Sequence, residues 1–157
     1  MLDKKIVAII GIVFVAGILI FWNSPAQKTS DVVEAGELRI SVFKSPTCGC
    51  CNGWVDYLEK NGLKVITVNT QDMSSIKEQY QVPEEMESCH TAVIEDYFIE
   101  GHVPVEAIKK LVEEKPAIKG IALPGMPIGA PGMPGQKTSP FEVYAISDGA
   151  PSVFFIG

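Results

Sequence analysis

The stretch LRISVFKSPTCGCCNGWVDYLEKNGLKVITVN, residues 38–69, contains a strand, a helix and a second strand in close succession. Residues 38–43 alternate apolar and polar side chains, as a half-buried strand does. Residues 54–62 place apolar side chains at helical spacing and end in Asn-Gly, a common signal for a helix C-terminus. Residues 63–69, which are rich in β-branched side chains, predict a second strand. Because the connections are short, the pattern predicts a parallel pair of strands, with the TCGCC cysteines at the amino end of the helix.

The residues that follow predict the rest of an α/β domain. Asp72 is placed to cap a short helix, and two short strands should flank Glu95-Asp96. Pro104 is well placed as the first residue of a helix that ends before Pro116. The apolar segments within 141–156 predict a C-terminal hairpin at the sheet edge. This order of elements predicts a thioredoxin-like domain, with a mixed central sheet and flanking helices.

The amino-terminal residues predict a membrane anchor or an export signal. Two lysines precede an uncharged, almost wholly apolar run, residues 6–22, which as a helix would cover roughly 26 Å, close to the hydrocarbon thickness of a bilayer. A cleaved signal peptide is the alternative. We therefore predict a membrane anchor or signal segment at 1–23, a linker at 24–37 and the thioredoxin-like domain at 38–157. The domain should lie outside the cytoplasm, on the periplasmic or cell-surface side, and be secreted as a soluble protein if the leader is cleaved.

Charge and compartment narrow the range of functions. The formal net charge is -6, so the protein should repel phosphate backbones, and nucleic acid is not an expected partner. Outside the cytoplasm, thiols are normally oxidised unless they are paired, metal-bound or kept reduced by a dedicated system. The cysteines therefore need a protecting arrangement.

All four cysteines and both histidines fall in two clusters between positions 48 and 102. Several thiolates with one or two imidazoles make a soft metal site, suited to Cu(I) or Zn(II) and less well to an iron–sulfur cluster. A strand that starts at Ser88–Thr91 would bring the second cluster back towards the first. The candidate metal ligands are Cys48, Cys50, Cys51, Cys89, His90 and His102.

The loop 123–135 repeats the tetrapeptide PGMP at 124–127 and 131–134. Its proline and glycine content excludes a helix or a central strand. Met126 and Met133 lie in this loop, and thioether sulfur suits Cu(I), so we add both as candidate ligands. Packing over the sheet is the alternative role for these side chains.

Other interpretations of the same residues remain open. Cys48 and Cys51 form a C-x-x-C pair, which a thiol-disulfide oxidoreductase would use to attack and resolve a substrate disulfide. The same pair could be a disulfide with no further role. Cys50 could be a small buried residue against the helix, and His102 a turn or surface histidine. The redox interpretation explains neither the third thiol of TCGCC nor the Cys89-His90 pair.

Four motifs occur in the order FKSPTCGCCNGWV, SCHTAV, IEGHVP and PGMPIGAPGM, from about Ile40 to Met133. In this region the chain resembles the bacterial domain-of-unknown-function family 411, often described as CopG-type or periplasmic metal-binding proteins. The resemblance implies a thioredoxin-like fold in an exported protein associated with resistance to copper or other heavy metals, without an established catalytic activity. It implies the same ligand set, with the two methionines as the less secure members. Where thioredoxin-like oxidoreductases carry a cis-proline, this chain has His90, which favours a binding site over an exchange site.

The sequence therefore favours an extracytoplasmic soft-metal-binding protein rather than an enzyme. We expect it to act in sequestration, transfer or resistance for copper as Cu(I), with zinc or an iron–sulfur cluster as the alternatives. The expected partners are the metal ion, the membrane through the N-terminal helix, and a second protein that exchanges the metal. The competing hypothesis is a membrane-anchored thiol-disulfide oxidoreductase that uses Cys48 and Cys51.

Overall fold

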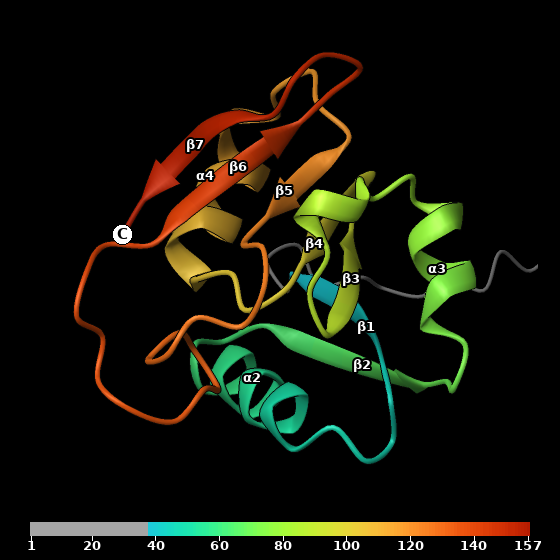
Figure 1. Cartoon of the computed structure of the whole chain (residues 1–157), viewed down its shortest axis with the longest axis vertical. Coiled ribbons are helices and arrows are strands. Elements are labelled where there is room, and N and C mark those ends of the chain that lie inside the picture. Colours follow the sequence, from blue (N-terminus) through green and yellow to red (C-terminus); the bar gives the residue numbers. More distant parts are fainter. Residues whose placement is uncertain (1–37) are drawn as a thin grey trace, which may run out of the picture. The chain divides into compact units, whose positions relative to one another are not determined.

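The computed structural model describes residues 38–157, which form a mixed α/β domain (Figure 1). The segments 1–23 and 24–37, predicted as anchor and linker, lie outside the described residues. In chain order the elements are β1 (Arg39–Lys44), α2 (Gly49–Lys60), β2 (Lys64–Asn69), α3 (Met73–Gln79), the short 3-10 helix η1 (Glu84–Met86), β3 (His90–Ile94), β4 (Tyr97–Glu100), α4 (Val105–Glu114), β5 (Gly120–Ala122), β6 (Glu142–Ile146) and β7 (Ser152–Ile156).

The seven strands form one sheet in the order β2-β1-β3-β4-β5-β6-β7. The pairs β1–β2 and β4–β5 are parallel, and the other neighbouring pairs are antiparallel. The parallel pair predicted from residues 38–69 is thus confirmed, as are the hairpin around Glu95-Asp96 and the C-terminal hairpin, which lies at the edge opposite β2.

The helices cover the two faces of the sheet unequally. Trp54 and Leu58 of α2 share one buried cluster with Ile108 and Leu111 of α4. The smaller cluster on the other face is built around Phe98, and Tyr80 at the end of α3 packs against it. Neighbouring strand residues point to opposite faces, so Phe98 belongs to the smaller cluster while its neighbour Ile99 belongs to the larger one.

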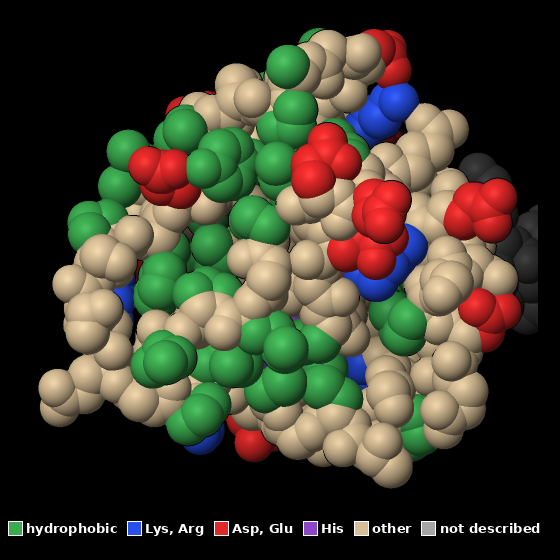
Figure 2. All heavy atoms as spheres, viewed as in Figure 1, with side chains coloured by type: hydrophobic (Ala, Val, Ile, Leu, Met, Phe, Trp, Pro, Cys, Tyr) green, Lys and Arg blue, Asp and Glu red, His purple; other side chains and the backbone are tan. Residues whose placement is uncertain are grey.

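Apolar side chains are also visible on the surface, where they gather across the lower part of the face drawn in Figure 2. The exposed large apolar residues of the described chain are Ile66, Val68, Met126, Ile128, Val153 and Ile156. None of the helices in 38–157 combines the length and the apolarity needed to cross a membrane.

Three details differ from the sequence-based expectations. The helix α2 begins at Gly49 rather than near Trp54, because Cys48 provides its N-cap. Pro104 is the N-cap of α4 rather than its first helical residue. The three-residue strand β5 was not predicted, since Gly120–Ala122 is too short to show a period.

The sheet topology brings the two cysteine-containing clusters of the chain, TCGCC and SCH, to the same end of the sheet. Because β1 and β3 are antiparallel, Lys44 at the end of β1 pairs with His90 at the start of β3. The strand β1 ends at Lys44, and α2 begins at Gly49 after a loop of four residues. The strand β4 ends at Glu100 beside the start of β3. This end of the sheet is therefore formed by the carboxyl ends of β1 and β4 and the amino ends of β3 and α2.

Candidate metal centre

The first group of sulfur atoms lies at the amino end of α2. Cys48 is the N-cap residue, and its Sγ accepts a hydrogen bond from the Cys51 backbone N–H at 3.3 Å. Cys50 and Cys51 lie in the first turn of the helix. The predicted position of the three cysteines, between β1 and the body of the helix, is confirmed.

The second group is carried by the β3–β4 hairpin. Cys89 immediately precedes β3, His90 is its first residue, and His102 follows β4 after Gly101. The N–H of Gly101 donates to the His90 carbonyl oxygen at 3.0 Å, which holds the two histidine-bearing segments together. Both imidazoles are fully buried, so the alternative of His102 as a surface histidine is wrong, although the residue does lie in the bend that follows β4.

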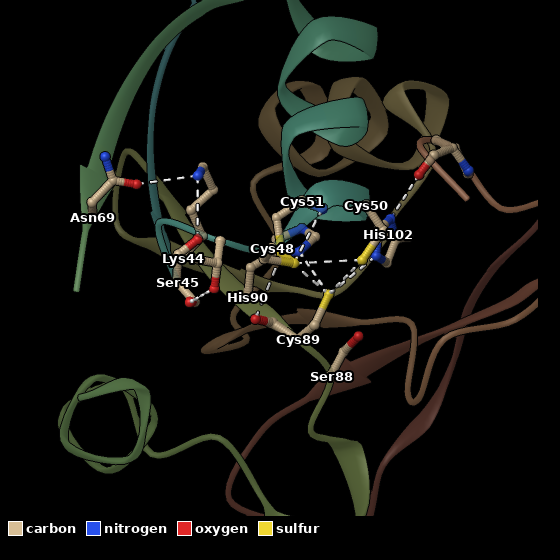
Figure 3. The surroundings of a disulfide bond; sticks show 12 residues. Lys44, Ser45, Cys48, Cys50, Cys51, Asn69, Ser88, Cys89, His90 and His102 are labelled. Atoms are coloured by element: carbon tan, nitrogen blue, oxygen red, sulfur yellow. Dashed lines mark hydrogen bonds between the residues drawn. A yellow bond between two sulfur atoms is a disulfide. The ribbon is translucent and has the colours of Figure 1, made fainter. Parts of the chain in front are cut away.

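The two groups meet at Cys89 (Figure 3). Its Sγ lies 3.9 Å from the Sγ of Cys50 and 3.5 Å from the Sγ of Cys51. The same sulfur lies 3.2 Å from Nδ1 of His90 and 3.1 Å from Nε2 of His102. Two sets of donor atoms each fall within 4.8 Å of one another, namely Cys48, Cys50, Cys51 and Cys89, and Cys89, His90 and His102. The structure thus brings together all six predicted Cys and His residues.

The cysteines are not equivalent in the state described. Cys48 and Cys51 form a disulfide, and Cys50 and Cys89 are free thiols. The buried cysteine at the helix is Cys51, whose exposure is 0%, whereas Cys50 is half-buried, so the alternative of Cys50 as a buried filler is wrong. A disulfide sulfur is a much poorer metal ligand than a thiolate. Reduction would therefore be needed before Cys48 and Cys51 could bind a soft ion.

The hydrogen bonds around Cys89 define the protonation of the metal-free site. Nδ1 of His102 lies 2.7 Å from the Pro131 carbonyl oxygen, which can only accept, so Nδ1 carries the proton and Nε2 offers its lone pair to Cys89. The thiol has one proton to donate to that lone pair, and its sulfur then accepts from Nδ1 of His90. This leaves Nε2 of His90 buried without a hydrogen-bond partner among the described residues.

Burial sets the titration of these groups. It raises the pKa of the Cys89 thiol to about 12, with the neighbouring Cys50 adding to the effect. It lowers the pKa of His90 to about 3, and the positive charges of protonated His102, Lys77 and Lys44 act in the same direction. The pKa of His102 is also lowered by burial, against the opposing bond to Pro131. Both imidazoles are therefore neutral at physiological pH, which is the form that binds metals.

The PGMP loop supports the site through its backbone. Gly132 has φ +80°, and an added Cβ there would lie 2.3 Å from the Trp54 backbone nitrogen. This close approach seats the loop against the first turns of α2 and aims the Pro131 carbonyl at His102. The methionines of the loop are placed differently from the cysteines: Met126 is exposed, and Met133 is partly buried against the main core. Their predicted role as ligands stays a prediction.

Sequence reasoning missed several buried polar residues around the site. Lys44, Lys77, Thr91 and Glu100 are all buried. Lys44 is bonded to the Ser45 carbonyl oxygen at 3.3 Å and to Oδ1 of Asn69 at 3.1 Å. A signal for one of them was present, because Glu100 stands in the otherwise apolar run of β4, where a charge must be paired to be tolerated.

Together, fold and site define a mixed α/β protein with a candidate soft-metal centre of thiols and imidazoles. The family model described as "Protein of unknown function, DUF411" matches residues 86–133. Two solved structures of copper resistance protein CopG, forms 1 and 2, are each 42% identical to this chain, with TM-scores of 0.71 and 0.72. Each match covers 77% of this chain and 98% of the CopG chain. No curated protein matches.

The chain therefore belongs to the DUF411 family, as the four motifs indicated. Its similarity to CopG extends over almost the whole of the CopG chains.

Proposed function

We propose that this protein binds copper as Cu(I) at the centre around Cys89 and serves copper resistance by sequestering the ion or passing it to another protein. The observation that carries this proposal is the convergence of four sulfur atoms and two neutral imidazoles from segments far apart in the sequence. Thiolate and imidazole are the donors that soft ions prefer. The 42% identity to copper resistance protein CopG favours copper over zinc or an iron–sulfur cluster.

The proposal also includes a thioredoxin-like fold and a location outside the cytoplasm. The order β2-β1-β3-β4, with β1 and β2 parallel and α2 between them in sequence, is what a thioredoxin-like core requires. The apolar N-terminal run supports a domain held outside the cytoplasm, and a partly oxidised site fits that compartment. A reporter enzyme that needs export for activity, fused after Gly157, should be active. An inactive, stably expressed fusion would place the domain in the cytoplasm.

The test of metal binding is an anaerobic titration of the full chain, fully reduced, with Cu(I) in competition with a colourimetric chelator. Zn(II) is titrated in parallel. Stoichiometric Cu(I) binding that outcompetes the chelator supports the proposal. Protein in which the Cys48–Cys51 disulfide is retained is the matched control, and it should bind Cu(I) more weakly because two of the four sulfurs are then unavailable as thiolates. Reduced protein that holds no Cu(I) would refute the proposal.

The Cys48–Cys51 disulfide favours a second candidate function, thiol-disulfide exchange. Cys51 is fully buried and Cys48 is half-buried, so an external thiolate would reach Cys48. Attack on the Cys48 sulfur would form a mixed disulfide and release Cys51 as a thiolate, and Cys51 would resolve it in the reverse step. The candidate requires exchange with a protein disulfide faster than that of a small dithiol. An equal rate would remove it.

A further inference from the structure

A buried carboxylate lies behind the candidate metal centre, on the other face of the sheet. Glu100 has an exposure of 0% and pairs directly with Thr91 across the β3–β4 ladder. Its Oε1 accepts from the Ser88 backbone N–H at 2.6 Å and from Nζ of Lys77. Its Oε2 accepts from Oγ1 of Thr91, also at 2.6 Å. Both oxygens of the carboxylate are thus occupied by donors.

The donors are placed at the two ends of a short segment. Ser88 and Thr91 flank the candidate ligands Cys89 and His90. One carboxylate therefore accepts hydrogen bonds from both ends of the segment 88–91. Strand alternation sends the Thr91 side chain towards Glu100 and the His90 side chain to the opposite face, against Trp54. Glu100 therefore acts on the segment from behind, without touching a ligand atom.

The backbone around Glu100 is fixed as well. Its carbonyl oxygen accepts from the N–H of Leu123, and the hydroxyl of Ser88 donates to the Gly125 carbonyl oxygen. An added Cβ at Gly101, the next residue, would lie 2.5 Å from the Leu123 carbonyl oxygen. The start of β3, the end of β4 and the beginning of the PGMP loop are therefore packed as one unit around this carboxylate.

Lys77 of α3 supplies the charge that Glu100 needs. The Lys77 side chain is 7% exposed and that of Glu100 is 0% exposed, whereas the ion pairs Lys110–Glu114, Lys115–Glu95 and Lys119–Asp148 lie at the surface. Buried ion pairs contribute little net stability, because desolvation cancels most of their attraction, whereas removing one partner is costly. A pair of this kind is better explained by the geometry that it imposes than by its contribution to folding.

We propose that Glu100, held by Lys77, is a positioning residue that places Cys89 and His90 next to the cysteine loop, residues 48–51. The proposal rests on the proposed function, since it assigns how that centre is held. It predicts that loss of the carboxylate loosens the Ser88–Thr91 segment selectively, and leaves the sulfur atoms at the start of α2 in place.

The test compares Glu100→Gln with wild type in the full chain, using Glu114→Gln of the exposed Lys110–Glu114 pair as the control. In metal-free protein with the disulfide intact, the two free thiols are alkylated with iodoacetamide, and the rates at Cys89 and Cys50 are measured by peptide mass spectrometry. We expect the Cys89 rate relative to the Cys50 rate to change by about threefold or more in Glu100→Gln and to stay constant in Glu114→Gln. Cu(I) affinity of the reduced protein should fall by roughly 10–100-fold, as for other outer-shell partners.

An unchanged ratio, or an equal acceleration at both thiols, would overturn the proposal, because a general loss of stability affects both. If Glu100→Gln does not fold, Thr91→Val decides, since it removes one hydrogen bond and keeps the ion pair. It should shift the ratio in the same direction by a smaller factor, and no shift would again overturn the proposal. The alkylation readout uses no metal. A wild type that binds no Cu(I) would therefore refute the proposed function and leave the positioning role to be judged by the ratio alone.

Discussion

The two regions that form the candidate metal centre are built in opposite ways. The cysteine loop places three sulfur atoms within four residues at a helix end, and two of them are joined as a disulfide. The hairpin region places Cys89, His90 and His102 by strand register, and it buries both imidazoles completely. In the first region the number of thiolates depends on redox state. In the second, the fold sets the positions of the donors. The second region should therefore contribute most of the Cu(I) affinity, and the redox state of the first should raise or lower that affinity.

The largest loss of Cu(I) affinity is expected for Cys89→Ser. Its sulfur belongs to both sets of donors and lies within 4 Å of two sulfurs and two imidazole nitrogens. We expect Cu(I) affinity to fall by more than the roughly 10–100-fold that loss of an outer-shell partner costs. Competition titration of the reduced variant measures this. Cys50→Ser, which belongs to one set only, is the matched comparison and should lose less. Equal affinities for Cys89→Ser and wild type would remove the hairpin region from the centre.

The burial of His90 should make metal-free protein sensitive to acid. The folded pKa is about 3 and the ordinary value is 6.5, so the unfolded chain binds more protons between these values. The free energy of unfolding should therefore fall as pH decreases from 6.5, by roughly 2–3 kcal/mol at pH 4.5 for a group this buried. Glu100, whose pKa is raised by burial, acts in the opposite sense and offsets part of the loss.

Urea unfolding of wild type and His90→Leu over pH 4.5–7 isolates the histidine, since the other titrating groups are common to both proteins. The variant should have the flatter pH dependence. Parallel curves would show that His90 is not the group that couples the hairpin region to pH.

Gly132→Ala tests the connection between the PGMP loop and the two regions. Both Gly132 and Gly125 have positive φ, but an added Cβ meets the Trp54 backbone only at Gly132, and at Gly125 it meets nothing within 4 Å. Gly125→Ala therefore measures the conformational cost alone. The excess cost at Gly132 is then the steric clash with the Trp54 backbone, and it should be about 1–3 kcal/mol in the free energy of unfolding, as for other overpacked positions. Cu(I) affinity should also fall, because the Pro131 carbonyl would move away from His102. Equal effects for the two variants would mean that the loop does not support the site.

The parts of the fold that were predictable are those governed by local periodicity. Residues 38–69 showed β1, α2 and β2 in order because strand alternation, helical spacing and an Asn-Gly stop all agree there. Cys48 and Cys89 were also placed correctly, because the sequence pattern showed where the helix and the strand beside them begin. The predicted N-terminal anchor lies outside the described residues and stays a prediction.

The parts that were not predictable depend on contacts between distant residues. The C-x-x-C spacing did indicate the pairing of Cys48 with Cys51, which the structure joins as a disulfide. The sequence does not show that the free thiols of Cys50 and Cys89 lie close together, since these residues are 39 apart. The bond from His102 to Pro131 joins residues 29 apart through a backbone carbonyl, which has no residue signature. Glu100 was visible as a charge in an apolar strand, but its partners come from α3 and from the segment before β3.

The smallest expected effect concerns the exposed methionine of the PGMP loop. Met126 has an exposed fraction of 56% and belongs to neither set of converging donors, so a centre made of the two regions does not need it. Met126→Leu keeps volume and apolarity, and removes only the thioether sulfur. We expect Cu(I) affinity in the competition titration to change by less than about twofold, below the roughly 10-fold expected for a supporting residue. Met133→Leu, at a partly buried position in the same loop, is the comparison. A tenfold loss of Cu(I) affinity in Met126→Leu, but not in Met133→Leu, would mean that the PGMP loop folds over the ion when it binds. The loop would then be a third region that supplies a ligand.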